Sequence, residues 1–241
     1  MNEAKNVEPL CERMRDLRRS YSCLTEVIFS INNTTDGTDL ILGDLSRSNE
    51  YGFVRVIHTV GARGSAIRKG VEAARGDIVV VMDSDGQYDP FEIPKLVQPI
   101  TDQGYCVSVG RNHASASILR RLISEGFKKF TKILLGVEYV QTGFKAGLRA
   151  VLLDTIPADA PGLDIDVRWM NNVVTKGYRD KLSSDFDVSV RPRLHGKTTF
   201  SPIKLALGLL CTIVVLFIER KTKRRLLMPG ILVRLTLYPN R

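Results

Sequence analysis

The run DIVVVM at residues 77–82 restricts the fold more than any other feature of the sequence. It contains five consecutive apolar residues with no alternating polar ones. Such a run is typical of a strand that helices cover on both faces, as in a parallel sheet. A helix is expected before it at residues 64–76, and another after it between Pro90 and Gln103. The sequence therefore predicts an α/β fold with a mostly parallel sheet and helices on both faces.

The alternation of helices and strands extends over the first half of the chain. Behind a capping stretch, Asn2-Glu3-Ala4, apolar residues recur at helical spacing: Val7, Leu10, Met14 and Leu17. Strands are expected at residues 26–31, 52–59 and 105–110, and a modest helix at residues 40–45. One boundary is expected near Thr198, between a domain of residues 1–198 and a tail of residues 199–241.

The tail from Val190 onward is basic and contains the most hydrophobic run of the chain. It carries 11 Lys and Arg against one acidic residue, whereas the remaining 24 basic and 25 acidic residues nearly balance. The apolar run at residues 205–218 is shorter than the roughly 20 residues that span a bilayer as a helix. Together with the cations that follow it, the run indicates contact with the cytoplasmic face of a membrane, in the interface or as one short span. A buried C-terminal helix is the alternative, and no nucleic acid is expected as a partner because no DNA-reading motif accompanies the charge.

Two carboxylates follow the apolar run directly, at Asp83 and Asp85, with Gly86 and Gln87 behind them. Ligands of open α/β sheets bind beyond the carboxyl ends of the strands, which is where this pair is expected to lie. Carboxylates two residues apart can converge on one cation, and Mg²⁺ often binds one or two carboxylates together with a substrate phosphate. A solvated acidic turn is the alternative. The strand before the pair and the YDP turn after it favour a site for a metal and a phosphate.

Several segments, in order, resemble those of the family 2 glycosyltransferases. The segment GSAIRKGVEAARGDIVVVMDSDGQYDPFEIPKLV at residues 64–97 is similar to the donor-site core of that family, most of all in the branch that makes polyprenyl- or dolichyl-phosphate sugars. Seven shorter matches accompany it, namely NEAKN, TTDGT, VGRN, RRLISEGF, QTGFKAG, GLDIDVRWM and RPRLHGKTT. The resemblance covers nearly all of residues 2–199.

The resemblance implies a GT-A fold and a metal-dependent, inverting hexosyltransferase. The expected donor is a nucleotide-diphosphate sugar such as GDP-mannose or UDP-glucose, the acceptor a polyprenyl or dolichyl phosphate, and the cofactor Mg²⁺ or Mn²⁺. The implied metal ligands are Asp83, Asp85 and Gln87. The implied donor contacts are Asn2, Glu3, Asn32, Asp36, Arg63, Asp83 and Ser84. The implied phosphate and acceptor contacts are Arg111, Arg121, Lys145, Asp166, Arg193 and Lys197, and the catalytic set is Asp83, Asp85, Arg193 and Lys197.

The nature of the acceptor decides whether a general base is required. A phosphate monoester has a second pKa of about 6, so the attacking oxygen of a polyprenyl phosphate is already largely anionic near neutral pH. An alcohol acceptor would need a positioned carboxylate, for which Asp164 and Asp166 are the candidates, with helix capping as an equally weighted interpretation of the pair. The alternative functions are a family 2 enzyme with a soluble or polysaccharide acceptor, and a catalytically weakened membrane-associated relative.

The chain departs from the family pattern at several places. Ile31-Asn32-Asn33-Thr34 stand where Asp-Asp-Gly-Ser is common, Tyr139 and Val140 replace an acidic residue, and Arg168 stands where Glu is frequent. The family's first strand, which would lie inside the sheet, has no counterpart before Asn2. We therefore expect either a start upstream of Met1, or a depleted sheet with unpaired backbone groups and a groove in the core.

Overall fold

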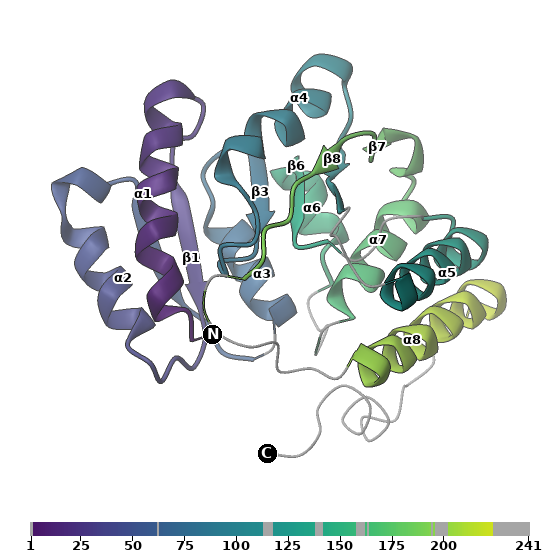
Figure 1. Ribbon diagram of the computed structural model, residues 1–241. Coiled ribbons are helices and arrows are strands. Elements are labelled where there is room, and N and C mark those ends of the chain that lie inside the picture. Colours follow the sequence, from purple (N-terminus) through teal and green to yellow (C-terminus); the bar gives the residue numbers. More distant parts are fainter. Residues whose placement is uncertain are drawn as a thin grey trace.

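The computed structural model describes residues 2–61, 63–112, 118–137, 142–157, 162, 164–193, 195 and 202–223 (Figure 1). Its α-helices are α1 (Ala4–Ser20), α2 (Thr38–Arg47), α3 (Arg63–Ala73), α4 (Ile93–Gln103), α5 (Ile118–Leu135), α6 (Arg149–Thr155), α7 (Ile165–Thr175) and α8 (Pro202–Thr222). Its strands are β1 (Val27–Ile31), β2 (Val54–His58), β3 (Ile78–Met82), β4 (Val107–Val109), β5 (Arg111–Asn112), β6 (Phe144–Leu148), β7 (Leu182–Ser183) and β8 (Asp187–Val188). Three short 3-10 helices, η1 (Asn49–Tyr51), η2 (Pro90–Glu92) and η3 (Arg179–Lys181), complete the set.

The helices and strands predicted for the first half of the chain are confirmed. Strands β1, β2, β3 and β4 lie within the ranges expected for them, and α1 to α4 correspond to the expected helices. The capping of α1 differs from the prediction, because the side chains of Asn2 and Glu3 do not cap it. Instead, the backbone N–H of Ala4 donates a hydrogen bond to Asp36 Oδ2 at 3.0 Å, so a residue from the loop after β1 caps this helix.

The strands form separate sheets rather than one. Strands β1 and β2 pair in parallel as a two-stranded sheet, and a four-stranded sheet has the order β3-β6-β4-β7. In the latter, β6 is antiparallel to both β3 and β4, whereas β4 and β7 are parallel. Strands β5 and β8 form a further parallel pair. The α/β class is confirmed. The central sheet is mixed rather than mostly parallel, because β6, a strand that the sequence did not predict, runs antiparallel to both of its neighbours.

Strand β3 is less buried than its apolar run predicts, although hydrophobic clusters cover both of its faces. All five of its residues are half-buried, although all are apolar. The physical reason is its place at the edge of its sheet, where β6 is its only paired strand among the described residues. Strand β1 likewise pairs only with β2 in the described part of the chain. The sheet is therefore divided between β1 and β3 in the described part of the chain.

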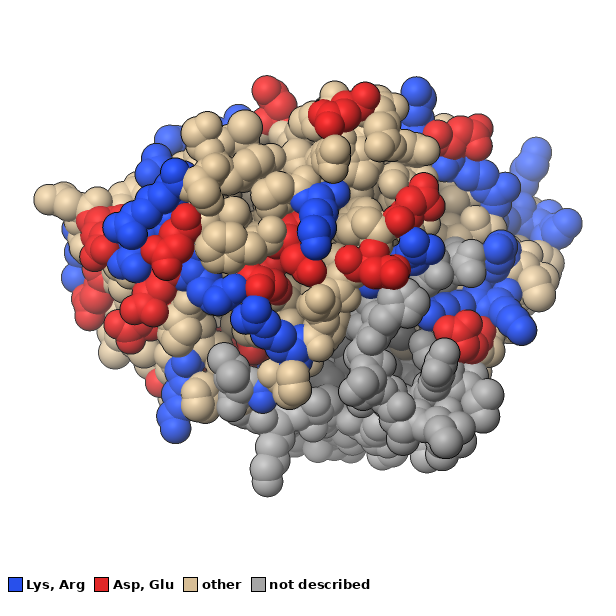
Figure 2. Space-filling view, turned by 45° about the horizontal axis from the view of Figure 1, so that its top comes forward, with Lys and Arg blue, Asp and Glu red and all other residues tan. Residues whose placement is uncertain are grey.

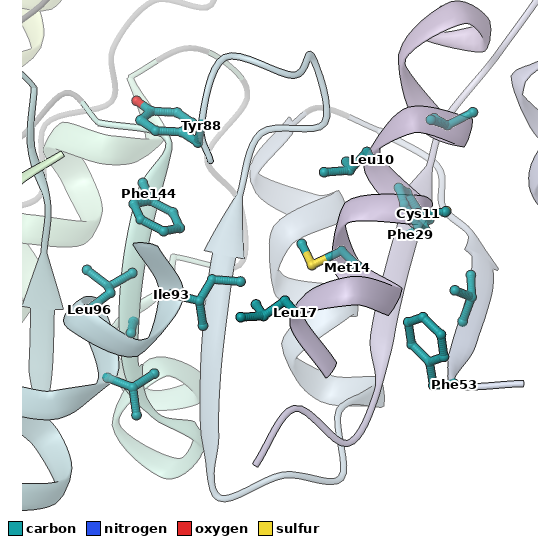
Figure 3. Packing of buried hydrophobic residues seen from close by; sticks show 14 of the residues in the cluster. Leu10, Cys11, Met14, Leu17, Phe29, Phe53, Tyr88, Ile93, Leu96 and Phe144 are labelled. Carbon is teal, nitrogen blue, oxygen red and sulfur yellow. The ribbon is translucent and has the colours of Figure 1, made fainter. Parts of the chain in front are cut away.

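One hydrophobic cluster joins the two sheets through α1. Leu10, Met14 and Leu17 of this helix pack in a common cluster with Phe29 of β1 and with Ile93 at the start of α4. Figure 3 shows Leu17 directed toward Ile93, with Met14 and Leu10 following it along the helix. Apolar burial across the division thus comes from a helix that covers it.

A second cluster covers the other face of β3, so helices lie on both sides of the strand. Ile78, Val80 and Met82 pack against the first cluster, whereas Val79 and Val81 pack against the second, as the two-residue period of a strand requires. The second cluster contains buried residues of α6, α7 and α8, including Trp169. Figure 1 shows α5 and α8 side by side at the end of the molecule opposite α1 and α2.

Helix α8 contains the apolar run of the tail. Leu209, Ile213 and Leu216 on one side of it are buried in the second cluster. None of the helices in the described ranges is both long enough and apolar enough to cross a membrane. The boundary expected near Thr198 lies outside the described residues.

Candidate functional site

The acidic turn after β3 is built as the sequence suggested. The backbone N–H of Asp83 donates to the carbonyl of Gly143 beside β6 at 3.1 Å, which continues the β3–β6 pairing by one residue. The N–H of Gln87 donates to Asp85 Oδ1 at 3.1 Å, and Gly86 has a φ of 75°. This left-handed conformation is the one that glycine adopts without steric cost, so it allows the chain to turn sharply behind the two carboxylates.

Asp83 belongs to a chain of alternating charges that leads into the protein. Arg63 at the start of α3 donates to Asp83 Oδ1 and to Asp166 Oδ2, each at 2.8 Å. Asp166 in turn accepts a hydrogen bond from Lys145 Nζ at 2.6 Å. Asp166, followed by Asp83, raises the pKa of the Arg63 guanidinium. Burial alone would raise the pKa of Asp166, but Lys145 and Arg63 outweigh it and hold that pKa below its usual value.

The position of Lys145 corrects the expectation that it contacts a phosphate. Its side chain is only 1% exposed, and its ammonium group donates to Asp166 and to the backbone carbonyl of Thr142. The same ammonium lies 5.3 Å from the ring centroid of Trp169. Lys145 therefore pairs with Asp166, and Asp166 pairs with Arg63. The two predicted acceptor contacts, Lys145 and Asp166, thus position Asp83 indirectly, through the hydrogen bond that Arg63 donates to it.

Asp85 faces a different cation. Arg193 Nη2 lies 3.4 Å from Asp85 Oδ2 and 2.7 Å from Glu3 Oε1, so one guanidinium lies between two carboxylates that are far apart in sequence. Burial raises the pKa of the Asp85 carboxyl, and the nearby charge of Asp83 adds to that effect. The two carboxylates of the turn thus repel each other in a partly desolvated place, a condition that favours the binding of a cation.

Asp89 and its two arginines complete the turn, although none of the three was among the predicted site residues. Asp89 caps η2 by accepting from the N–H of Phe91, and it forms ion pairs with Arg13 of α1 and with Arg191. Arg191 also accepts through its backbone carbonyl a hydrogen bond from Gln87 Nε2 at 3.3 Å. The RPR run in the sequence was the available signal, but only its second arginine was assigned a role.

The predicted donor contacts lie around the carboxyl end of β1. Asn2 exchanges two hydrogen bonds of 3.0 Å with Thr35, one through its side-chain nitrogen and one through its side-chain oxygen. Asn32 donates to the carbonyl of Gly61, whereas its buried Oδ1 has no partner. Asp36 accepts from Ala4 and also from the N–H and hydroxyl of Thr38, so it shapes this loop.

The remaining predicted residues are dispersed. Ser84 lies between the two carboxylates and is half-buried. Arg111 of β5 pairs with Asp187 of β8 at 3.0 Å and donates to the carbonyl of Asp185 at 2.9 Å. The side chain of Arg121, the residue Lys197 and the replaced positions Tyr139 and Val140 lie outside the described residues.

Asp164 and Asp166 are both engaged in ion pairs. Asp164 is fully buried, makes no capping hydrogen bond from its side chain, and accepts from Arg168 Nε at 2.6 Å. Arg168, which replaces the frequent Glu, thus neutralises the acid at the N-cap position of α7, one turn before it. Since Asp166 is held by Lys145 and Arg63, each of the two predicted base candidates has a cationic partner.

The donor set of the turn fits a hard divalent cation. Asp83 remains 42% exposed despite its pairing with Arg63, and Asp85 keeps a raised pKa beside it. Within the described ranges, no cluster of three or more His, Cys, Asp or Glu side chains is placed to hold a metal. Two carboxylates suit an ion that takes its other ligands from water and from a substrate phosphate, as Mg²⁺ commonly does.

On the face shown in Figure 2, Lys and Arg are interspersed with Asp and Glu, as expected for a nearly neutral domain.

The sequence model of Glycosyl transferase family 2 matches residues 1–156. The chain belongs to this family. The match includes the acidic turn and ends shortly after β6, so the family 2 signature contains Asp83, Asp85 and Lys145 but not the segment of Arg193.

Family 2 relatives with assigned names support the resemblance to the branch that makes lipid-phosphate sugars. A dolichol-phosphate mannosyltransferase of Pyrococcus furiosus is 28% identical over 220 residues, covering 84% of this chain and 59% of the relative. A dolichol-phosphate mannosyltransferase of Saccharomyces cerevisiae is 27% identical, covering 66% of this chain and 61% of the relative. An undecaprenyl-phosphate mannosyltransferase of Micrococcus luteus is 26% identical, with 77% and 73% covered. The chain thus spans about 60% of the length of the first two relatives.

Solved structures support the GT-A-like α/β fold. Glucosyl-3-phosphoglycerate synthase from Mycobacterium tuberculosis in complex with uridine-diphosphate has a TM-score of 0.65 at 21% identity, covering 90% of this chain and 77% of that one. A complex of the same synthase with Mn²⁺, uridine-diphosphate-glucose and phosphoglyceric acid has a TM-score of 0.62 at 20% identity, with 91% and 76% covered.

Proposed function

We propose that this family 2 member transfers a hexose, with inversion, from a nucleotide-diphosphate sugar to a polyprenyl or dolichyl phosphate at the cytoplasmic face of a membrane. Asp83, Asp85 and Gln87 would hold a Mg²⁺ or Mn²⁺ ion beside the donor diphosphate. The names of the dolichol-phosphate and undecaprenyl-phosphate relatives support the acceptor class, and the Mn²⁺ complex of the structural neighbour supports a divalent ion. The donor sugar and the nucleotide base are left open, since Asn32 stands where the family has an acid.

The juxtaposition of Asp83 and Asp85 with Arg63 and Arg193 carries this proposal. A nucleoside diphosphate leaving group develops negative charge, which a bound divalent ion neutralises as a Lewis acid. Arg63 fixes the orientation of the Asp83 carboxylate before substrate arrives, because its second hydrogen bond to Asp166 anchors it. Arg193 lies next to Asp85 and presents a planar set of donors suited to phosphate oxygens.

The ion pairs of Asp164 and Asp166 favour a phosphate acceptor over an alcohol. A carboxylate that is to remove a proton from a hydroxyl must reach it and must have an accessible lone pair. Asp164 is buried against Arg168, and Asp166 is held between Lys145 and Arg63. A lipid phosphate brings its own anionic oxygen and requires no such base, so the arrangement of these residues is consistent with that acceptor.

A transfer assay tests the proposal directly. The full chain is incubated with a panel of sugar nucleotides that includes GDP-mannose and UDP-glucose, with Mn²⁺ or Mg²⁺ and a short polyprenyl phosphate. We expect a product that extracts into organic solvent, and its formation to be abolished by EDTA and by Asp85→Ala. Asp44→Ala is the matched control and should retain full activity, because Asp44 is exposed on α2 and pairs with Arg47 of the same helix.

Each other result contradicts a defined part of the proposal. A sugar product that remains in the aqueous phase, formed with a soluble acceptor, would point to the alternative acceptor class. Nucleotide binding without transfer to any acceptor, unchanged by Asp85→Ala, would refute the catalytic role. Activity that persists in EDTA would refute the proposed requirement for a divalent ion.

A further inference from the structure

Helix α8 has two different apolar sides, one buried against the second cluster and the other exposed in the described part of the chain. Leu209, Ile213 and Leu216 are buried against the second cluster. On the opposite side, four residues are exposed, and none of them is charged: Leu207, Cys211, Val214 and Ile218. Their intervals of four, three and four residues place them on a single face about 16 Å long. We call these four residues the α8 stripe.

The α8 stripe has a fixed orientation relative to the candidate site. Arg220 donates to the backbone carbonyl of Leu135 on α5 at 3.1 Å and to that of Asn171 on α7 at 3.4 Å. The N-terminal turn of the same α7 carries Asp166, which belongs to the ion-pair chain behind Asp83. A surface that docks through the stripe would therefore be held at a constant orientation to the acidic turn.

The described residues at the C-terminal end of the α8 stripe include two exposed cations. Lys221 and Lys223 are exposed there, whereas Arg220 is directed to α5 and α7 and Glu219 is half-buried. Lys221 is exposed at the end of the stripe, and its ammonium lies 5.8 Å from the ring centroid of Phe217. On the neighbouring helix α5, Ile133 adds a further exposed apolar side chain.

We propose that the α8 stripe is a docking face for an anionic lipid bilayer, with α8 lying along the membrane surface rather than crossing it. An apolar face flanked by Lys and Arg is the pattern of helices that bind in the plane of the interface, where the apolar side chains enter the acyl boundary and the cations meet the headgroups. A bilayer is favoured over a second copy of the chain because the exposed lysines lie at the end of this apolar face, where anionic headgroups would meet them.

This inference rests on the proposed function and makes it more specific. A lipid phosphate acceptor lies at the headgroup level of the bilayer. Docking through the α8 stripe would bring the protein to that level while α7 keeps the ion-pair chain at a set orientation. The acceptor then reaches the site by moving in the plane of the membrane.

Vesicle co-flotation of the full chain tests the docking face. The double variant Val214→Glu/Ile218→Glu places two charges on exposed positions of the stripe, where burial does not oppose them. Leu40→Glu is the matched control, because Leu40 is an exposed apolar residue on α2 at the opposite end of the molecule (Figure 1). The probes are vesicles of phosphatidylcholine alone and of phosphatidylcholine enriched in phosphatidylglycerol.

We expect the wild type and Leu40→Glu to bind the anionic vesicles and to release from them as salt rises. The double variant should bind on the order of tenfold more weakly or worse, since it loses apolar contact and gains repulsion. Equal binding by the double variant, or no preference of the wild type for anionic vesicles, would overturn the inference. So would a dimer in light scattering that the double variant converts to a monomer.

The failure of the inference is distinguishable from failure of the proposed function. If both are correct, the double variant still transfers sugar to a short polyprenyl phosphate supplied without vesicles but loses transfer to a long-chain acceptor in vesicles. If the wild type docks as expected and yet transfers sugar to no lipid phosphate, the docking face stands and the proposed function does not.

Discussion

Replacing Lys145 by Met is the sharpest test of the ion-pair chain behind the acidic turn. Lys145 is 1% exposed, and its ammonium interacts with Asp166 at 2.6 Å, with the Thr142 carbonyl and with the ring of Trp169. Met has a similar length and no charge, so the substitution leaves the apolar part of the packing nearly intact. What it removes is the partner of a buried carboxylate.

The expected loss of unfolding free energy is large because the buried Asp166 carboxylate cannot replace Lys145 with solvent. Removing one partner of a buried ion pair typically costs about 3–5 kcal/mol of the free energy of unfolding. Arg63 remains bonded to Asp166 at 2.8 Å, so the carboxylate keeps one cation and the lower end of that range applies. A loss of about 3 kcal/mol corresponds to a fall in Tm of roughly 6–12 °C for a protein of this size.

Lys176→Met provides the control. Lys176 and Asp154 form an ion pair at the same distance of 2.6 Å, but the two side chains are 42% and 45% exposed. An exposed pair contributes at most about 1 kcal/mol, so this variant should lose no more than roughly 4 °C. Urea titration and differential scanning calorimetry of both variants measure the contrast. Equal losses, or a Lys145→Met protein as stable as the wild type, would refute the argument that burial makes this pair important.

Three further predictions concern the turn, the first sheet and the divided sheet. A Cβ on Gly143 would overlap the Asp83 carboxylate, so Gly143→Ala should reduce kcat/KM for sugar transfer about a hundredfold, whereas Gly126→Ala, with open space around it, should not. Burial alone would raise the pKa of Glu26, but hydrogen bonds from the Arg75 N–H and from Arg55 outweigh burial and lower that pKa. The ionised Glu26 therefore adds to the free energy of unfolding above about pH 4.3, and this contribution is lost as the pH falls. In urea unfolding, Glu26→Gln should be destabilised by about 1 kcal/mol at pH 7 and by much less at pH 3. No described strand joins β1 to β3, so a five-residue apolar segment added before the first residue should raise the Tm more than a Gly-Ser segment of equal length, and equal Tm values would contradict this prediction.

The local part of the fold was predictable because it depends on periodicity. The spacing of Val7, Leu10, Met14 and Leu17 is sufficient to identify α1, since all four residues are buried on one side of it. Strand β6 was not predictable in the same way. It carries Lys145 at its second position, and Gly143 and Gly147 weaken its pattern, because glycine has a low strand propensity. These residues are there for reasons of close packing and charge that only the tertiary structure reveals.

The candidate site was predictable in its acids but not in their partners. Asp83 and Asp85 are identified by the strand before them, a local feature of the sequence. Arg63 and Asp166 are 103 residues apart, so nothing local indicates that they form an ion pair or that Lys145 is buried behind them. The partial burial of β3 could not be predicted either. Its apolar run predicts a fully buried strand, but its exposure depends on its place at the edge of the sheet, which no local feature of the sequence indicates.

The divided sheet gives the ion pairs at the acidic turn a second role. No strand in the described part of the chain connects β1 to β3, so polar contacts as well as the packing of α1 set the position of the first sheet relative to the turn. Two such contacts reach across, from Glu3 to Arg193 and from Arg13 to Asp89. Arg193 also approaches Asp85, so an anionic substrate that engages this arginine competes with Glu3 for it. The pair of Arg13 and Asp89 does not involve Arg193, so it would keep α1 attached to the turn if a substrate drew Arg193 away from Glu3.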